Sequence, residues 1–309
     1  MLCVRDMTLD FQRYDGAFVK KSPLKIISGF SVEVAAGGIT AVIGSSGAGK
    51  SLLAHAVLGI LPKNAVTGGV IEFKGEALTP RRLKELRGRA IALVPQSVSF
   101  LNPLIAVGRQ VRRAAHLTVR DRARAARLRD EAFTRYGLGP EVKRRYPFQV
   151  SGGMARRVLT AMATVADAEL IIADEPTTGL DQALIGESLG YLRRLAGAGK
   201  GVMLITHDIE NALRCADRVA VFYGGRTVEV ARPADFVPGG PLRHPYTRAL
   251  FASLPRQGFT PLRGHQPFGD NLPAGCVFAP RCPLRSPLCD RRSPERKEIN
   301  GGSVWCHHA

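Results

Sequence analysis

A glycine-rich segment at residues 44–51 carries the clearest chemistry in the sequence. It reads Gly-Ser-Ser-Gly-Ala-Gly-Lys-Ser, a complete phosphate loop, and it follows 39–43, an apolar run typical of a buried parallel strand. Glycines let the backbone aim its N–H groups at phosphates, and a predicted helix over 52–58 points its positive end at the same anion. Lys50 is placed to bridge the β- and γ-phosphates, and Ser51 to bind Mg²⁺. The segment predicts a nucleoside triphosphate site formed by Gly44, Ser45, Gly47, Ala48, Gly49, Lys50, Ser51 and Leu52.

A second segment, 170–175, ends in two carboxylates. Its four leading apolar residues predict a buried strand, and the carboxyl end of such a strand is where α/β sheets carry their chemistry. Asp174 is placed to hold the Mg²⁺ shell through water, and Glu175 to polarise the attacking water as a general base. Because Pro176 follows, a simple turn cap is the alternative. The phosphate loop upstream favours hydrolysis.

A Ser-Gly-Gly turn at 151–153 opens a predicted helix and makes a second anion site. One nucleotide rarely needs two phosphate cradles, so we expect this one to serve a nucleotide bound to another subunit. The turn resembles the signature motif of ATP-binding-cassette (ABC) ATPases. Other motifs follow in that family's order: Gln96 after the strand-like 90–94, Asp181 in Thr-Gly-Leu-Asp, and His207 in Leu-Ile-Thr-His-Asp. The resemblance covers most of residues 1–235.

The resemblance implies a head-to-tail dimer in which two ATP molecules are shared between subunits. Gln96 would sense Mg²⁺ and the attacking water, His207 would bond the γ-phosphate, and Asp181 would signal across the interface. The partner's ATP would be clamped by Ser151, Gly152 and Gly153, although Val150 and Met154 replace the family's usual Leu and Gln. The implied catalytic residues are Glu175, His207 and Gln96, and the implied Mg²⁺ ligands are Ser51, Gln96 and Asp174.

An aromatic side chain is expected to stack on adenine. Phe11 fits this position best, Tyr14 is the second choice, and a buried core phenylalanine is the alternative for Phe11.

The fold expected is α/β: a phosphate-loop ATPase sheet with an antiparallel β subdomain and an inserted helical subdomain at about 97–157. Strands at 170, 202 and 219 alternate with helices from 182 and 209, the βαβ rhythm of a parallel sheet. We place the cassette domain at 1–235 and an irregular, cysteine-rich extension at 236–309.

Composition agrees with an ATPase at the cytoplasmic face of the inner membrane. The 309 residues contain no apolar run near the length of a membrane span and no apolar signal region at the start. The formal charge of +18 is concentrated in arginine-rich helical stretches such as 109–129, without interleaved aromatic residues. We interpret them as solvated helix faces with a secondary attraction to anionic lipid, and expect no nucleic-acid partner.

Two segments narrow the subfamily. Residues 96–103 and the Arg-His-Pro-Tyr-Thr-Arg-Ala-Leu stretch at 243–250 resemble importers of oligopeptides, dipeptides and nickel. That resemblance implies a second ABC ATPase, more often different than identical, two membrane permeases and an extracytoplasmic solute-binding protein. The alternative is a non-transport ABC ATPase acting on nucleic acid or the ribosome. The 101 positions from Lys50 to Ser151 leave no room for the long coiled coil of DNA-repair relatives.

The sequence leaves two classes of transported cargo possible: peptides, and nickel or metallophore complexes. Three stretches favour the nickel branch: Ser-Gly-Gly-Met at 151–154, Tyr-Gly-Gly-Arg at 223–226 and Leu-Arg-His-Pro at 242–245.

Four of the six cysteines fall within 31 positions of the extension: Cys276, Cys282, Cys289 and Cys306. Clustered cysteines in a reducing compartment indicate metal before disulfides, and this spacing lacks the close pairs of zinc ribbons. Some members of the resembling family carry a [4Fe-4S] cluster here, which makes a cluster the first choice and Zn²⁺ the second. His307 and His308 are further possible ligands, and simple packing of small thiols is the alternative.

Overall fold

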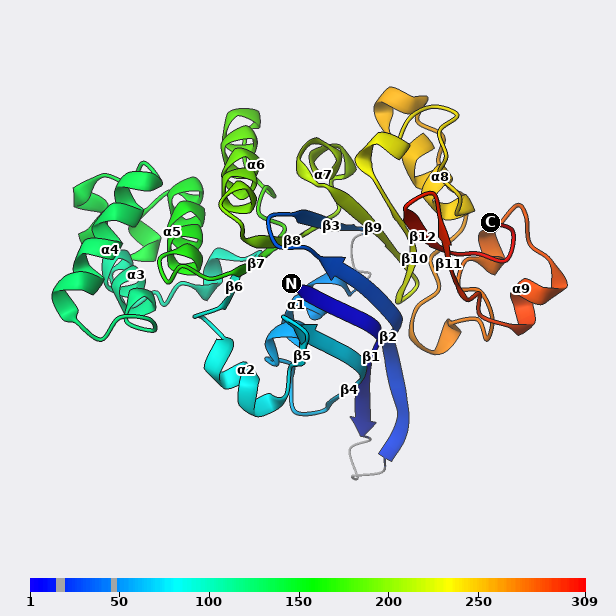
Figure 1. Ribbon diagram of the computed structural model, residues 1–309, viewed down its shortest axis with the longest axis horizontal. Coiled ribbons are helices and arrows are strands. Elements are labelled where there is room, and N and C mark those ends of the chain that lie inside the picture. The colour runs from blue at the N-terminus through cyan, green and yellow to red at the C-terminus, as the bar shows by residue number, and fades with distance from the viewer. Residues whose placement is uncertain (15–19, 46–48) are drawn as a thin grey trace. The chain divides into compact units, whose positions relative to one another are not determined.

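The computed structural model describes residues 1–14, 20–45 and 49–309 (Figure 1). Two compact units emerge: the first contains 1–35, 39–78 and 206–309, and the second contains 36–38 and 79–205. Two of the predicted phosphate-loop residues, Gly47 and Ala48, lie outside the described residues.

The first unit contains an antiparallel layer. In it, β1 (Leu2–Tyr14) pairs with β2 (Lys20–Val34) on one side and β4 (Ala65–Phe73) on the other, and β4 carries the short β5 (Glu76–Ala77). Buried side chains in β1 change parity, from positions 2 and 4 to positions 7 and 9. The pairing register shifts between Val4 and Met7, and Asp6 has φ of 46°. This irregularity returns both apolar pairs to the buried side.

The same unit continues through strands in the order β2-β10-β9-β3. All five residues of β3 (Ile39–Ile43) are buried, and β3 runs parallel to β9 (Arg218–Tyr223). A turn at Gly224 and Gly225, both with positive φ, joins β9 to β10 (Arg226–Ala231). The helices here are α1 (Lys50–Leu58), which follows the phosphate loop, and α7 (Ile209–Cys215).

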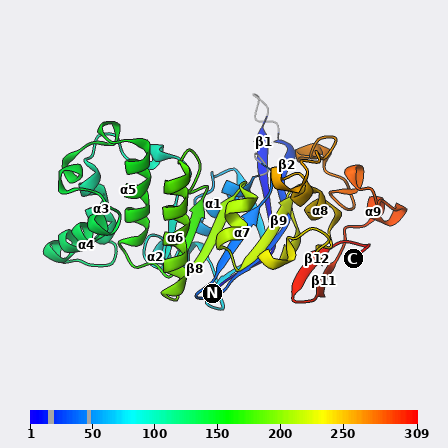
Figure 2. The same ribbon diagram turned by 90° about the horizontal axis from the view of Figure 1, so that it is seen from above.

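The C-terminal extension is built onto this sheet. Its last two strands, β11 (Arg296–Ile299) and β12 (Gly302–Trp305), form a hairpin, and β12 pairs antiparallel with β10 (Figures 1 and 2). Helices α8 (Pro245–Ala252) and α9 (Pro287–Arg291) precede the hairpin. The 3₁₀ turn η4 (Pro233–Asp235) lies before α8, and three more, η5 (Pro255–Gln257), η6 (Gly269–Asn271) and η7 (Ala279–Arg281), lie between α8 and α9. The extension, which we predicted to be irregular, therefore contains two helices and a β-hairpin.

The second unit has a parallel sheet in the order β8-β7-β6, formed by β6 (Ile91–Val94), β7 (Leu170–Asp174) and β8 (Gly201–Thr206). Its helices are α2 (Pro80–Leu86), α3 (Val107–Ala115), α4 (Arg122–Arg135), α5 (Gly152–Thr164) and α6 (Gln182–Gly197), with 3₁₀ turns η1 (Val98–Phe100), η2 (Pro140–Arg144) and η3 (Pro147–Gln149). The predicted α/β class is confirmed. Among the described helices, none combines the length and apolar character that crossing a bilayer requires.

A buried histidine begins α8. The Nδ1 atom of His244 accepts a hydrogen bond of 3.1 Å from the Tyr246 backbone N–H, which caps the helix. Glu229, fully buried, accepts bonds from the backbone N–H groups of Arg243 and His244 at 2.9 and 3.0 Å. Burial lowers the pKa of His244 to about 3, so the imidazole stays neutral and keeps its acceptor.

This cap predicts a loss of stability in mild acid. The unfolded chain binds a proton at this histidine below about pH 6.5, whereas the folded chain does not until about pH 3, so stability falls as the pH drops between these values. At about 1.4 kcal/mol per pH unit, the loss between pH 6.5 and 5 is about 2 kcal/mol. His244→Asn keeps a capping oxygen without titrating. Denaturation of the full chain at both pH values should show a fall smaller by about this amount in the variant.

The matched control is His265→Asn, because His265 is exposed. It should keep the wild-type pH dependence. An equal fall in His244→Asn and wild type would contradict the role of the neutral imidazole.

Candidate functional site

The phosphate loop begins where two stretches of backbone almost touch. A Cβ atom on Gly44 would lie 2.3 Å from the carbonyl oxygen of Phe222, so no other residue fits there. Gly49 has φ of 88° and caps α1 with its backbone in the left-handed region. Glycine is thus required at both described ends of the loop.

Lys50 places a buried positive charge at this loop. Its Nζ donates hydrogen bonds to the carbonyl oxygens of Gly44 and Ser45, both at 2.8 Å, and the residue is only 6% exposed. Ser51 and Leu52, both half-buried, occupy the first turn of α1, where backbone N–H groups favour an anion. The glycine-only backbone, the ammonium and the helix end fit the phosphates of ATP, and the Ser51 hydroxyl is a suitable Mg²⁺ ligand.

The extension reaches this loop through two side chains that sequence reasoning missed. The Ser45 hydroxyl donates a 2.6 Å hydrogen bond to Oε1 of Gln266, and the Tyr246 hydroxyl lies within hydrogen-bonding reach of the Ser45 backbone and side chain. Burial raises the pKa of Tyr246 to about 12, which keeps its proton in place. The Tyr246 ring packs against Tyr223 and Phe278, with centroids 4.3 and 5.5 Å away. Of these two residues, only Tyr246 belongs to a sequence motif, the His-Pro-Tyr stretch, and that motif did not indicate a contact with the phosphate loop.

Three other predicted residues belong to the first unit. Phe11 lies in β1 and is half-buried, so it is not one of the core side chains. Tyr14 ends β1, but its side chain is outside the described part. His207 is exposed and follows the end of β8. The adenine contact of Phe11 and the phosphate contact of His207 stay predictions.

The second unit brings the predicted carboxylates to one sheet edge. Parallel pairing of Val94 with Ala173 aligns the carboxyl ends of β6 and β7. Gln96, exposed, lies just beyond β6, while Asp174 and Glu175, both buried, lie at the end of β7. Gln96 and the two carboxylates therefore follow the ends of two neighbouring strands, a pairing that the sequence did not specify.

Glu175 is held in a strained backbone conformation. Its φ is 48°, in the left-handed region that non-glycine residues rarely adopt. The Glu175 N–H donates to the Ile205 carbonyl at 2.8 Å, its carbonyl accepts from Nη1 of Arg156 at 2.9 Å, and its Oε2 accepts from the Thr178 hydroxyl at 3.2 Å. These three contacts fix where the carboxylate points. Arg156, on α5, was not predicted, because nothing local in the sequence shows that it reaches Glu175.

The predicted signature turn begins α5. Ser151 is the N-cap and accepts a 3.2 Å bond from the Met154 N–H, while Gly152 is exposed with open space around it. A Cβ on Gly153 would touch Leu184 at 3.4 Å. Asp181 caps α6 in the same way, accepting from the Leu184 N–H at 3.0 Å. The turn therefore presents backbone N–H groups to an incoming anion.

Exposed apolar side chains follow the Gln96 motif. Val98, Phe100 and Leu104 are 40, 54 and 84% exposed, respectively. Phe148, just before the signature turn, is 75% exposed and stacks on Tyr146 with ring centroids 5.7 Å apart.

The four clustered cysteines lie close enough to influence one another, but not as a ligand set. Burial and the neighbouring thiols raise the pKa values of Cys276, Cys282 and Cys306. The Cys276 N–H bonds to the Cys289 carbonyl at 2.7 Å, and His308 Nε2 lies 3.5 Å from the Cys289 sulfur. Within the described residues, no group of three or more His, Cys, Asp or Glu side chains is placed to hold a metal. The donor chemistry suits a metal, whereas the arrangement does not.

Comparisons with known proteins agree with the motifs. Residues 27–178 match the family described as ABC transporter, and residues 228–289 match the C-terminal region of oligopeptide/dipeptide transporters. The chain is 35% identical over 316 residues to the dipeptide transport ATP-binding protein DppD of Bacillus subtilis, covering 95% of this chain and 90% of that one. It is 37% identical to the oligopeptide transport ATP-binding protein OppD of Mycobacterium tuberculosis, covering 97% of this chain and 50% of that one.

A solved structure shares the fold. A dimeric ATP-binding cassette in a post-hydrolysis state, bound to ADP and Pi, matches with a TM-score of 0.66 at 22% identity over 75% of this chain and 99% of that chain. The phosphate loop, the carboxylates at the end of β7 and the signature turn define an ABC ATPase. The chain belongs to the ABC transporter family, in the branch that carries the oligopeptide/dipeptide C-terminal region, and it is a transport-coupled ATPase.

The contact between Ser45 and the extension predicts an effect on ATP binding. Gln266→Ala removes a bond that orders the loop, so ATP affinity should fall about fivefold, equivalent to about 1 kcal/mol for one hydrogen bond. Titration calorimetry of the full chain with ATP measures it. His265→Ala, at the exposed neighbouring position, is the control and should keep the wild-type affinity.

Ser45→Ala removes the other partner, so the double variant should lose no more affinity than either single one. Additive losses would mean that the two side chains act separately.

Proposed function

We propose that this protein powers the import of peptides across the inner membrane, from its cytoplasmic face. The observation that carries the proposal is the pairing of an ABC transporter match with the oligopeptide/dipeptide C-terminal region in one chain. Relatives aligned over nine-tenths or more of their own length are named as dipeptide or peptide transport proteins. The nickel or metallophore alternative rests on short sequence stretches alone.

The chain's own residues supply the parts of the reaction. Lys50 and the amide groups at the start of α1 hold the β- and γ-phosphates, and Glu175 accepts a proton from the attacking water. Ser51, Gln96 and Asp174 would hold Mg²⁺, which neutralises charge on the phosphates when bound. His207 would contact the γ-phosphate. Arg156 and Thr178 keep the Glu175 carboxylate oriented through the hydrogen bonds described above.

Hydrolysis is proposed to occur in a dimer with a second ABC ATPase, more often a different chain. The exposed Ser151 and Gly152 at the start of α5 would clamp the partner's ATP, and Asp181 would carry the signal between sites. Phe11 is the proposed adenine contact. Exposed ends of both capped helices, α5 and α6, support this shared site.

The permease is proposed to dock beside the Gln96 motif. Leu104, 84% exposed, and Phe100, 54% exposed, offer apolar area that water solvates poorly. Two permeases and an extracytoplasmic solute-binding protein complete the proposed importer, and the binding protein and permeases select the cargo. We propose no nucleic-acid partner.

The cysteines of the extension are proposed to bind one metal centre, a [4Fe-4S] cluster before Zn²⁺. Support comes from the proximity of the thiols: after burial, the neighbouring cysteines also raise the pKa values of Cys276 and Cys282. A bound metal would favour the thiolate form. Some rearrangement is required, since the described side chains form no ligand set.

Replacing the general base tests the mechanism. Glu175→Gln keeps the shape of the side chain but cannot take the proton, so hydrolysis in the full transporter should fall about a hundredfold or more while ATP binding is retained. Glu131→Gln, an exposed glutamate on α4, is the control and should hydrolyse normally. Unchanged phosphate release in Glu175→Gln would refute the assignment. If nickel chelates stimulated wild-type hydrolysis and dipeptides did not, the cargo would be a nickel complex and not a peptide.

Purification without oxygen tests the metal centre. The chain should be brown, with about four iron and four sulfide per chain, and Cys289→Ser should lose the colour. Cys3→Ser, far along the sequence from the cluster, is the control. Colourless protein with stoichiometric zinc would mean a structural zinc site, and metal-free protein with a folded extension would mean packed thiols.

A further inference from the structure

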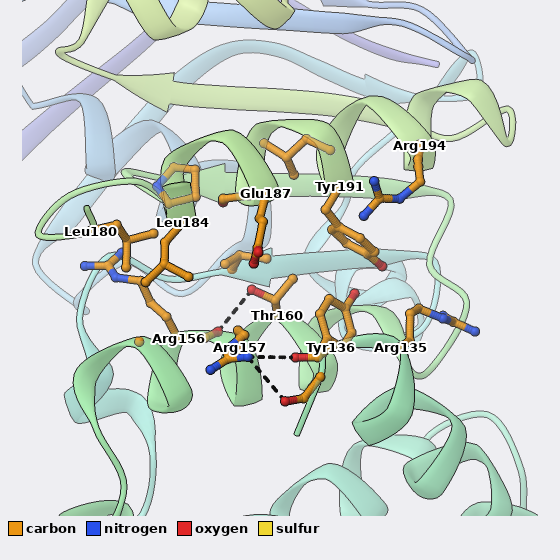
Figure 3. Close-up of a pocket in the computed structure, with 16 residues that line it drawn as sticks. Arg135, Tyr136, Arg156, Arg157, Thr160, Leu180, Leu184, Glu187, Tyr191 and Arg194 are labelled. Atoms are coloured by element: carbon orange, nitrogen blue, oxygen red, sulfur yellow. Dashed lines mark hydrogen bonds between the residues drawn. The ribbon is translucent and has the colours of Figure 1, made fainter. Parts of the chain in front are cut away.

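A cavity of about 360 Å³ lies in the second unit between α5 and α6, beside the end of α4. Figure 3 shows Arg156 and Arg157 on the α5 side and Leu184, Tyr191 and Arg194 on the α6 side. Cavities of this size hold small organic molecules. Gly153 and Arg156 of the lining also belong to the proposed ATP machinery, but that machinery assigns no ligand to the cavity itself.

One wall of the cavity is apolar. Leu180, Leu184 and Leu192 line it, and the rings of Tyr136 and Tyr191 meet edge to face with centroids 4.7 Å apart. The Tyr191 side chain is only 7% exposed. A compact ring or a short acyl group would bind favourably here, because its apolar surface would be buried against this wall.

The rest of the lining is strongly positive. Four arginines face one glutamate, Glu187, which gives a formal charge of +3. Arg194 lies over the Tyr191 ring, 5.6 Å from its centroid. Arg135 and Arg194 are exposed, while Arg156 and Arg157 are half-buried. A ligand with an anionic head would be attracted to this lining.

Two buried polar atoms in the lining make no hydrogen bond within the described part of the chain. They are Nε of Arg157 and the hydroxyl of Tyr191. Arg157 already donates through Nη1 to the carbonyls of Tyr136 and Gly137, both at 3.3 Å, and the Tyr136 hydroxyl, close to that of Tyr191, bonds to Thr164 at 2.7 Å. Buried polar atoms of this kind normally have hydrogen-bond partners. Both atoms can donate a hydrogen bond, so a ligand that supplies an acceptor atom would satisfy them.

We propose that this cavity binds a small amphipathic anion, a carboxylate or phosphate ester on a compact apolar body, and that binding inhibits ATP hydrolysis. The apolar part of the ligand packs against the apolar wall, and its anionic group pairs with the arginines. The inhibition rests on the proposed function, whereas the binding does not.

The link to hydrolysis runs through Arg156. Its Nη1 holds the carbonyl of the strained Glu175, and the residue also lines the cavity. An anion that pairs with Arg156 competes for that donor, which loosens the backbone that aims the base. The cavity also separates α5 from α6, whose first residues include the signature turn and the Asp181 cap. A ligand between them acts on both ends of the proposed ATP clamp.

Binding is tested on the full chain with an aromatic sulfonate that fluoresces in apolar surroundings, 8-anilinonaphthalene-1-sulfonate. Saturating ATP and Mg²⁺ keep the probe out of the phosphate loop. We expect 1-naphthyl phosphate to displace the probe, and neutral 1-naphthol or inorganic phosphate to displace it at least tenfold less well. Equal displacement by 1-naphthol would overturn the anionic site.

Three variants localise the effect. Arg135→Glu with Arg194→Glu reverses two exposed charges of the lining and should weaken probe binding at least tenfold. Arg193→Glu changes the same kind of charge next to Arg194 on α6 but outside the lining, and should bind as wild type. Ser188→Trp fills the cavity from a half-buried position and should abolish binding. Wild-type binding in the charge-reversed or the filled variant would overturn the proposal.

Inhibition is measured in the full transporter. 1-Naphthyl phosphate should lower wild-type ATP hydrolysis but leave Ser188→Trp unaffected. Equal inhibition of both would overturn the regulatory role. A transporter that hydrolyses no ATP under any condition would refute the proposed function, while the binding result on the isolated chain would stand.

Discussion

The structure depends most on how Glu175 is held. The role proposed for Glu175 as a general base requires its carboxylate to stay aimed at one place, and the backbone here is kept at φ of 48° against its intrinsic preference. Such strain costs of order 1–3 kcal/mol and persists only where neighbours over-determine the geometry. The neighbours are the β8 carbonyl of Ile205, the α5 guanidinium of Arg156 and the Thr178 hydroxyl. The parallel sheet, the signature helix and the following turn thus all converge on one residue.

A similar constraint governs the phosphate loop in the first unit. Gly44 passes so close to the Phe222 carbonyl that no side chain fits between the start of the loop and β9. From β9 the contact continues through Tyr223 to Tyr246 and Phe278, and from Tyr246 back to Ser45. The extension is therefore part of the surroundings of the loop. Phe278 is two residues from Cys276 and packs against Tyr246. The cysteines are therefore connected to the phosphate loop through a short series of packed side chains.

The sequence predicted those features that local chemistry dictates. Gly44, Lys50 and Ser51 form a motif because one loop and one helix end suffice to make the site, and Ser151 and Asp181 are predictable as caps for the same reason. Arg156 and Gln266 were missed because each acts on a residue far along the chain, at Glu175 and Ser45. The β11–β12 hairpin was missed because it gains its stability from pairing with β10, which the local pattern does not show.

The arginines show most clearly what composition cannot predict, namely where in the fold each charged side chain lies. The net charge of +18 and the arginine-rich stretch at 109–129 suggested solvated helix faces. Arg129, itself half-buried on α4, pairs with Asp130, and with Lys143 nearby the pKa of that carboxyl falls to about 2. Arg156 and Arg157 lie outside that stretch, half-buried against carbonyl oxygens and a cavity. A guanidinium has five donors in a fixed fork, so a half-buried one constrains the backbone around it far more than a solvated one does. Which arginines constrain the backbone of this chain is therefore decided by their place in the fold, which a count of charges does not contain.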